Sequence, residues 1–305
     1  MGYGLDVSCG WRHVCDVAPM KKAFPVFFLL YALACLYTLY SYDMFASVLA
    51  RMALCWCAGL LVMVALFFVG RHKKRYDIVD VGWGLSFIAI AVSGFFLQDG
   101  HRLRWDPQAL ATLLVMVWGG RLSWHIWQRF RRSGQEDMRY VELRKKWKGS
   151  VATNAFFRIF VVQSLLALLV SIPVIHINLE TDVGWSLWIY AGLGLWLVGF
   201  ACEVVADAQL KHFLMNPKNH GKLMTEGLWK YSRYPNYFGE ITMWWAFAVM
   251  ALGTPHGWVG LGGAAIITYL IVYISGIPPK EVHLKTRDGW QQYVKNTRSL
   301  VPLPK

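Results

Sequence analysis

The sequence lacks several features that mark common classes of soluble protein. No glycine-rich GxGxxG segment joins a strand-like to a helix-like segment, which argues against a Rossmann domain, so any nucleotide must bind in another way. The six cysteines form no CxxC repeats, and Cys55 and Cys57 lie in an apolar run, where cysteine behaves as a small hydrophobic residue. We therefore predict neither a disulfide framework nor a metal site. The chain also shows no internal repeat and no low-complexity linker.

Acidic residues are scarce, and this raises the question of a nucleic-acid partner. The chain has 18 Asp and Glu against 31 Lys and Arg, a net charge of +13. Most of the cations fall in four segments, 71–75, 129–148, 211–233 and 280–305, which are alternate loops plus the C-terminal tail. Basic loops that alternate in this way are typical of the cytoplasmic side of a membrane protein. We therefore predict no nucleic-acid partner.

Long apolar runs, in contrast, are abundant. Hydrophobic residues make up 56% of the 305 residues, in runs that can each cross the ~30 Å of hydrocarbon in a bilayer. We predict an all-α integral membrane protein, a bundle of about eight (7–8) transmembrane helices. The expected spans are about 24–40, 46–69, 77–97, 108–128, 155–176, 184–210, 236–254 and 257–277.

The span count and the basic loops agree on one topology. Residues 1–19 carry no pattern and are expected to be a leader, and 20–305 a single transmembrane domain. The basic loops and both termini would then face the cytosol of a multi-pass protein in a bacterial inner membrane or the endoplasmic reticulum. Gly192, Gly194 and Gly199 inside one span are expected to serve helix packing.

Charged residues inside spans are costly and usually functional. Here they are Asp77, Asp80, Arg121, His125, Glu203, Asp207 and Glu240, and all fall in the cytoplasmic third of their spans. Arg121 and His125 share a helix face, and so do Glu203, Asp207 and Lys211. We expect these stripes to face inward and meet. The alternatives are interfacial caps, snorkelling side chains, and an Asp80–Arg121 ion pair with a purely structural role.

The segment 227–240 combines polar, basic and aromatic residues. Pro235 suits a helix start, and Asn236, Tyr237 and Glu240 project from the first turns. With Lys230 and Arg233 nearby, an anion site is predicted, rather than only a basic membrane-boundary loop. The amphipathic tail 277–302 could close over a phosphate-bearing ligand, which makes 204–302 the expected cofactor-binding part.

Three motifs in this half resemble one family. Asp207 with Gln209 and Leu210, then GLWKYSRYPNYFGE, then SGIPPKE to GWQQYVKNTRSLVP are similar to the C-terminal half of steroid 5α-reductase-like membrane proteins. YDIVDVGWG and VWGGRLSWHIWQR resemble the N-terminal motifs of a bacterial-type, largely uncharacterised branch, so that the resemblance covers 76–302. A related R-x-P-x-Y-x-G form occurs in isoprenylcysteine methyltransferase-like proteins, which places both in one superfamily.

The resemblance implies a reductase that uses NADPH, held in a transmembrane pocket open to the cytosol, to reduce a carbon–carbon double bond conjugated to a carbonyl. The cofactor-binding residues so implied, with their neighbours, are Glu203, Asp207, Lys211, Lys230, Tyr231, Arg233, Asn236, Tyr237, Glu240, Glu281, Arg287 and Tyr293. The family's Gln-Glu pair is absent. By span order Asp80 stands on the helix of the acid and Trp118 or Arg121 on that of a tyrosine. This departure counts against a steroid itself, and the expected substrate is steroid-like or another lipid.

The chemistry needs a hydrogen-bond donor at the carbonyl oxygen, where negative charge develops after hydride addition. A protonated Asp80 could serve, and so could Arg121 or His125; the sequence leaves all three open. Two rival functions also remain: an S-adenosylmethionine-dependent lipid or prenylcysteine methyltransferase, and a non-enzymatic membrane protein such as a transporter or scaffold. The sequence does not predict an oligomeric state.

Overall fold

The computed structural model describes residues 45–98, 104–181 and 183–305. The chain divides into two units, 1–48 and 49–305, and the second holds nearly all of the described residues. The predicted leader 1–19 and the first predicted span 24–40 lie outside the described residues. The prediction that 20–305 form one domain therefore stays a prediction.

The described residues are helical, apart from turns and one isolated bridge between Ser232 and Arg298. Six segments are long and apolar enough to cross a membrane: Ser47–Lys73, Tyr76–Phe96, Pro107–Ser133, Val151–Val170, Leu187–Met215 and Gly257–Leu284. Another apolar helix, α10 (Pro235–Ala251), has 17 residues and stands where a seventh span is predicted. The predicted all-α, multi-pass membrane fold is confirmed, and the count of 7–8 is compatible with these segments.

Among the other helices, the long ones lie close to predicted spans, whereas α5 and α13 lie outside them and α12 begins where the last one ends. The bounds of all these helices are α2 (Phe45–Lys73), α3 (Val79–Phe96), α4 (Pro107–Ser133), α5 (Met138–Lys145), α6 (Val151–Ala155), α7 (Val162–Val170), α8 (Ile172–Leu179), α9 (Leu187–Met215), α11 (Gly260–Tyr269), α12 (Ile277–Leu284) and α13 (Trp290–Asn296). The largest difference concerns the predicted span 155–176. The membrane helix runs from Val151 to Val170, and the separate helix α8 begins at Ile172, with Pro173, which has no N–H to donate, in its first turn.

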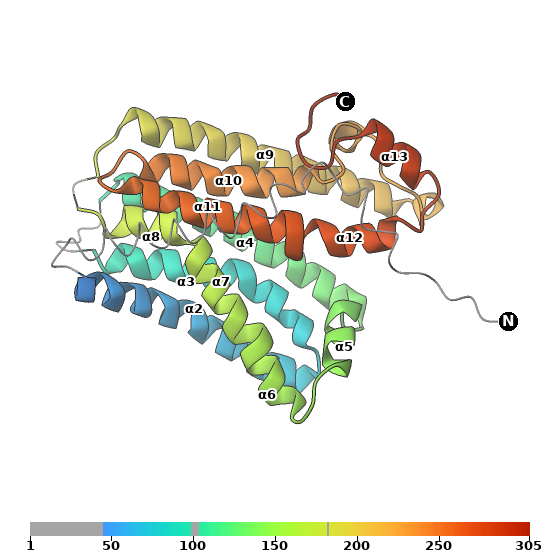
Figure 1. Cartoon of the computed structure of the whole chain (residues 1–305), viewed down its shortest axis with the longest axis horizontal. Helices are drawn as coiled ribbons and strands as arrows, with labels where there is room; N and C mark the ends of the chain where they lie inside the picture. The colour runs from blue at the N-terminus through green and yellow to red at the C-terminus, as the bar shows by residue number, and fades with distance from the viewer. Residues whose placement is uncertain (1–44, 99–103, 182) are drawn as a thin grey trace. The chain divides into compact units, whose positions relative to one another are not determined.

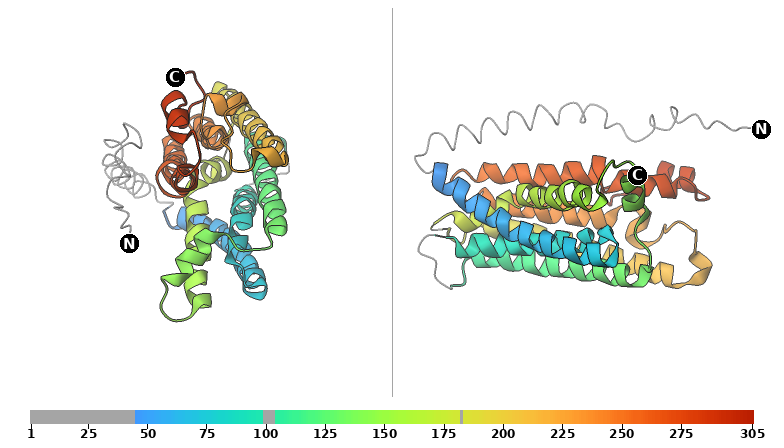
Figure 2. Two further views of the ribbon diagram at one scale, coloured as in Figure 1. Left: turned by 90° about the vertical axis from the view of Figure 1, so that its right-hand side faces the viewer. Right: turned by 90° about the horizontal axis from the view of Figure 1, so that it is seen from below.

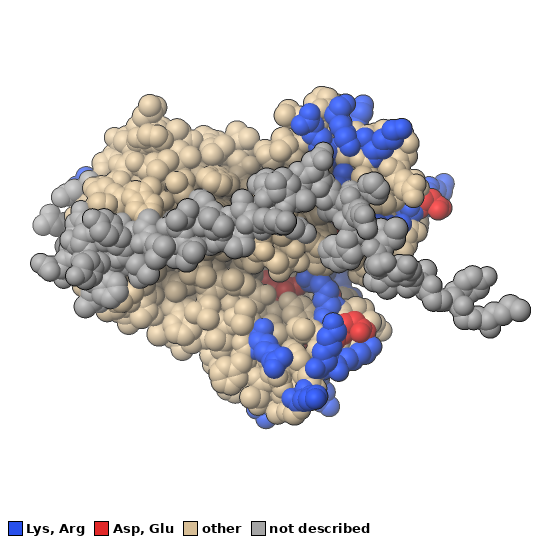
Figure 3. All heavy atoms as spheres, viewed as in Figure 1, with Lys and Arg blue, Asp and Glu red and all other residues tan. Residues whose placement is uncertain are grey.

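Successive long helices run in alternating directions, so their ends gather at two sites (Figures 1 and 2). At one end Arg75 donates to the Phe130 carbonyl and Arg287 to the Lys222 carbonyl. At the other, Gln98 and Gln108 both donate to the Glu180 carbonyl. The first end holds the four basic segments, as the charge pattern predicts, and we call it the basic end. In Figure 3 most of the visible Lys and Arg lie towards the right, where α5 and α13 lie in Figure 1.

Helices α9 and α10 approach one another through glycines. A Cβ added at Gly199 would lie 2.8 Å from the Gly239 carbonyl oxygen, and one at Gly192 2.8 Å from the Ala246 oxygen. The packing role predicted for these two residues is confirmed. It is wrong for Gly194, where an added Cβ would meet no atom of the described residues within 4 Å. The close contact continues to Glu203, whose backbone nitrogen lies 2.7 Å from a Cβ built on Gly239, so it also fixes the position of this acid.

The glycine contact gives a direct stability test. We expect Gly199→Ala to lower the thermal unfolding temperature of the purified protein in detergent, because backbone atoms block the new methyl group; overpacking of this kind costs about 1–3 kcal/mol. Gly194→Ala on the same helix is the matched control and should leave the unfolding temperature unchanged or raise it, since alanine is the better helix former. Equal effects of the two substitutions would contradict the close contact.

Candidate functional site

Arg121 on α4 joins two carboxylates of α9. One terminal nitrogen of its guanidinium lies 2.6 Å from Glu203 Oε1, and the other lies 2.5 Å from Asp207 Oδ2. Glu203 and Asp207 are one helical turn apart, so both can meet one planar guanidinium. The polar stripes of α4 and α9 therefore meet at these three residues, as the sequence predicts.

The Glu203 carboxylate is buried and has a second donor. The indole nitrogen of Trp118, one turn before Arg121, lies 3.2 Å from Glu203 Oε2. Trp118 is itself fully buried, packed edge-on to Trp244 with ring centroids 5.4 Å apart. Both oxygens of Glu203 are thus bonded, as a buried charge requires. Trp118 contributes to this site by holding an acid in place.

Helix α10 supplies the third side of the cluster. Asn236 donates to Asp207 Oδ1 at 3.3 Å, while its own side-chain oxygen is buried and has no hydrogen-bond partner among the described residues. The half-buried Glu240 lies one turn further on and makes no hydrogen bond or ion pair with a described residue, although Glu203 and Lys280 are close enough to act on its charge. The ammonium of Lys280 lies 4.1 Å above the ring of Tyr237. Partnerless polar groups inside a bundle are unusual and indicate space for a ligand.

His125 lies one turn beyond Arg121 on the same face of α4. Its side chain is exposed, and its charged neighbours are Asp207, Arg121, Arg129 and Lys211. It therefore stands at the mouth of the Arg121–Glu203–Asp207 cluster, on the side of the basic end. The described residues contain no group of three or more His, Cys, Asp or Glu side chains that could hold a metal ion.

Asp80 does not join this cluster. Its carboxylate accepts hydrogen bonds from Tyr140 at 2.5 Å and Arg139 at 2.9 Å, and Arg129 lies 3.5 Å away. The Asp80–Arg121 ion pair, one of the alternatives open from the sequence, is wrong, because Arg121 is held by Glu203 and Asp207. Tyr140 and Arg139 reach Asp80 because α5 and the residues before it fold back over the start of α3.

Asp80, Arg139 and Tyr140 form a second cluster, which the alternation of acids and bases over 136–145 in the sequence could have indicated. Asp77, at the start of the same span, accepts from Arg75 and from the backbone nitrogen of Asp137. Burial, followed by the charge of Asp80, raises the pKa of Tyr140 well above its ordinary value. The phenol stays protonated and donates to Asp80 at any physiological pH.

Arg233 and Glu281 form a third group, in which the C-terminal tail is tied down. The buried guanidinium of Arg233 lies 3.2 Å from Glu281 and donates to the Thr297 carbonyl at 2.8 Å. Tyr293 donates to the Trp229 carbonyl at 2.6 Å. In this structure, these predicted cofactor-binding side chains hold the tail against the segment before α10.

A cavity of about 630 Å³ lies beside this group. Lys230, Tyr231 and Tyr293 line it, together with Asn296 and Lys305. Three predicted cofactor-binding residues thus share one cavity at the basic end. Arg287, which donates to the Lys222 carbonyl, is engaged just beyond it.

The comparisons with known proteins agree with these motifs. The family model described as a protein of unknown function (DUF1295) matches residues 66–297. An uncharacterized protein of Schizosaccharomyces pombe is 24% identical over 229 residues, which cover 65% of this chain and 66% of that protein. The 3-oxo-5-alpha-steroid 4-dehydrogenase 1 of Macaca fascicularis is 32% identical over 112 residues, 36% of this chain and 39% of that enzyme.

A further relative is the Delta(14)-sterol reductase of Schizosaccharomyces pombe, which is 31% identical over 91 residues, 29% of this chain and 21% of that enzyme. The matches thus span less than two thirds of the length of each of these relatives. They confirm the resemblance to steroid 5α-reductase-like membrane proteins that the motifs predict.

The charged cluster predicts a strong and specific loss of stability. Arg121→Gln leaves two neighbouring carboxylates without their cation, and removing one partner of a buried ion pair costs about 3–5 kcal/mol. Because Arg121 is 21% exposed, we expect a value near the lower figure, measured by thermal or denaturant unfolding in detergent. Adding Glu203→Gln should recover part of the loss. Arg129→Gln is the control; this exposed cation should cost less than about 1 kcal/mol, and a double variant as unstable as the sum of the single ones would contradict the coupling.

Proposed function

The chain belongs to the family described as a protein of unknown function (DUF1295), and from this membership and the site we propose that it is a membrane-embedded, NADPH-dependent reductase. Its reaction would reduce a carbon–carbon double bond conjugated to a carbonyl, in a steroid-like or other lipid substrate. The names of the steroid dehydrogenase and sterol reductase relatives support the reaction class.

One observation carries the proposal beyond the family. Polar groups from α4, α9 and α10 converge inside an otherwise apolar bundle, and two of them, the Asn236 oxygen and the Glu240 carboxylate, are left without a hydrogen-bond partner among the described residues. Purely structural networks satisfy their buried members. A cluster that leaves acceptors open at its centre is suited to a ligand with hydroxyl or amide donors.

The residues present fit NADPH. Its ribose hydroxyls and carboxamide are donors for Asn236 and Glu240, and its phosphates need cations. Lys211 near His125 and Lys280 over Tyr237 lie at the cluster, and Lys230 lines the cavity of about 630 Å³. When bound, NADPH would supply the hydride for the double bond. Arg233 would act through the tail that it holds, because its guanidinium is already engaged by Glu281 and Thr297.

The chain's own part in the reaction is to stabilise the charge that develops on the substrate carbonyl. Asp80 is bound by Tyr140 and Arg139, and Arg121 is held by two carboxylates. His125 makes no hydrogen bond or ion pair with a described residue, so it is the candidate donor with the most freedom. The His125 imidazole carries an N–H whether it is neutral or charged, and we propose that it donates this N–H to the developing oxyanion. A proton from solvent then completes the reduction at the α-carbon.

The position of the site suits a lipid substrate. The cluster lies near the basic end, which we propose faces the cytosol, where the charge rule places basic loops and where NADPH is available. Apolar side chains are exposed on the outward faces of the helices, among them Leu197 and Val198 on α9. These faces suit contact with lipid, and we propose that a lipid-like substrate reaches the cluster sideways from the bilayer.

Cofactor binding is the first test. We expect NADPH to raise the thermal unfolding temperature of the purified protein, since a ligand at about 100 times its Kd adds about 2.7 kcal/mol to stability. The combined Asn236→Ala and Glu240→Gln substitutions should reduce this shift, and Glu142→Gln on the exposed face of α5 should leave it intact. Stabilisation by S-adenosylmethionine and not by NADPH would overturn the proposal in favour of a methyltransferase.

Turnover is the second test, with NADPH oxidation followed over a panel of lipid enones. We expect His125→Ala to lower the rate by at least about a hundredfold while the NADPH-induced thermal shift persists, because the donor acts on the substrate. His72→Ala, at the exposed end of α2, controls for loss of a histidine and should keep full activity. If Asp80→Asn abolishes turnover and His125→Ala does not, the donor role belongs to Asp80.

A further inference from the structure

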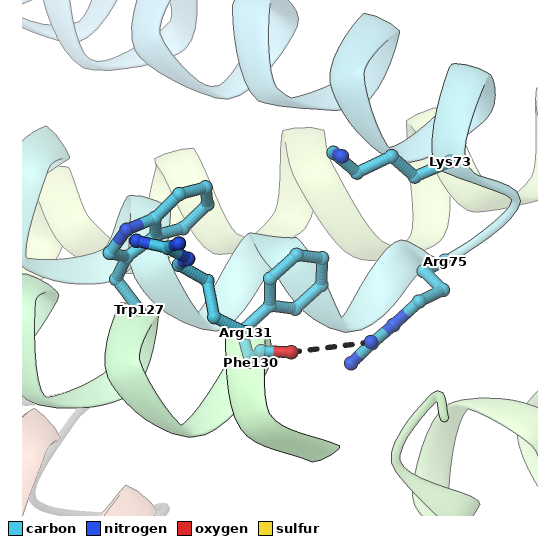
Figure 4. A pocket seen from close by; sticks show the side chains of 5 residues that line it. All are labelled: Lys73, Arg75, Trp127, Phe130 and Arg131. Atoms are coloured by element: carbon cyan, nitrogen blue, oxygen red, sulfur yellow. Dashed lines mark hydrogen bonds between the residues drawn. The ribbon is translucent and has the colours of Figure 1, made fainter. Parts of the chain in front are cut away.

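A hollow lined by cations and aromatic rings lies where α2 ends and α4 approaches its last turns. Its volume is about 450 Å³, and its walls are Lys73, Arg75, Trp127, Phe130 and Arg131. Figure 4 shows Lys73 and Arg75 on one side and the three residues of α4 on the other. The volume is within the range of ~300–1,000 Å³ found for small-ligand sites. None of these residues belongs to the candidate active site.

Arg75 is held rigidly at the edge of this hollow. It donates to the Asp77 carboxylate through two nitrogens at 3.2 and 2.9 Å, to the Phe130 carbonyl at 3.2 Å and to Ser133 Oγ at 2.8 Å. Its guanidinium also stacks 4.0 Å above the Phe130 ring. Four of its five N–H groups are thus used, and one on Nη1 remains.

The other two cations have no such partner. Lys73 and Arg131 are exposed, and within the part of the chain that the structure describes neither forms an ion pair with a carboxylate. Among the described residues, these three cations form one ion pair, between Arg75 and Asp77. The hollow is therefore left with an excess of positive charge and with donors that face an open space.

The hollow lies at the boundary between lipid and water. Trp124, Trp127 and Arg131 are spaced along one face of α4, and Trp124 is 61% exposed. On α2, Val69 stands one turn before Lys73 and is 37% exposed. On both helices, apolar side chains therefore continue from the cations into the apolar part of the span. Trp127, stacked on Phe130 with ring centroids 5.8 Å apart, has the place of an interfacial tryptophan.

We propose that this hollow binds the head group of an anionic phospholipid. The phosphate would be held by Lys73, Arg131 and the remaining N–H of Arg75, and the acyl chains would follow the apolar faces that carry Val69 and Trp124. Basic pockets between membrane helices are suited to acidic lipid head groups, with about 1 kcal/mol from each cation near the surface. The site is separate from the proposed reductase function and does not depend on it.

The test uses the whole protein, purified and delipidated in a neutral detergent. Dioctanoylphosphatidylglycerol, dioctanoylphosphatidylcholine and inorganic phosphate are titrated separately, and binding is measured by native mass spectrometry and by the thermal unfolding temperature. We expect phosphatidylglycerol to bind and stabilise the protein at concentrations where phosphatidylcholine does neither. Inorganic phosphate should have little effect at the same concentrations, because it lacks the chains.

Matched variants locate the binding. The combined Lys73→Gln and Arg131→Gln substitutions should weaken phosphatidylglycerol binding roughly thirtyfold, which corresponds to the loss of two near-surface charges. Lys146→Gln with Lys148→Gln removes the same net charge from exposed positions at the same end and should change binding less than about threefold.

The unfolding temperature without lipid shows that both double variants fold. If the two double variants weaken phosphatidylglycerol binding equally, the lipid is held by diffuse charge attraction and the proposed site is overturned. If inorganic phosphate stabilises the protein as much as the lipid does, the hollow is a site for free anions, and the proposal of a phospholipid site is overturned.

Discussion

The polar interior depends on one guanidinium shared by two carboxylates. Arg121 approaches the membrane interior on α4, and Glu203 and Asp207 meet it from α9 at 2.6 and 2.5 Å. Each of these charges alone would be expensive inside a bilayer. Paired, they become a fixed connection between two helices, and Asn236 extends this connection to α10. The bond from the Trp118 indole to Glu203 is a second side-chain link between α4 and α9.

The glycine contact and the ion pair are two parts of one arrangement. Gly199 and Gly239 allow the backbones of α9 and α10 to touch, which brings the first turns of α10 beside Glu203. A larger residue at either glycine would move Asn236 and Glu240 away from Asp207. Small residues on one helix face therefore determine the geometry of charged residues on another. This explains how a site can be formed inside a membrane without any loop that enters it.

The sequence predicted the parts that depend on local rules. Span length, basic loops and the i,i+4 spacing of Glu203 and Asp207 are properties of single helices, and all three appear in the structure. The partners of Asp80 depend on how the 134–146 segment folds back onto α3, and no periodicity in a span reveals that. In the same way, Arg233 was predicted to bind phosphate because of its neighbours in sequence, whereas its partners Glu281 and Thr297 arrive from the tail. Gly194 shows the same limit on a smaller scale, since which face of α9 is covered depends on α10.

The basic end therefore contains cations of three physical kinds. Arg121, Arg233 and Arg75 are fixed by acids or carbonyl groups of the chain itself and hold elements together. Others form no ion pair with a described residue and are suited to bind phosphate: Lys230 stands beside Tyr231 and the cavity of about 630 Å³, and Lys280 stands over Tyr237. The rest are exposed at helix ends. One excess of positive charge thus includes cations that hold the fold together and cations that are free to meet an anion, and only the partners of each side chain distinguish them. Net charge alone would have assigned a single role to all of them.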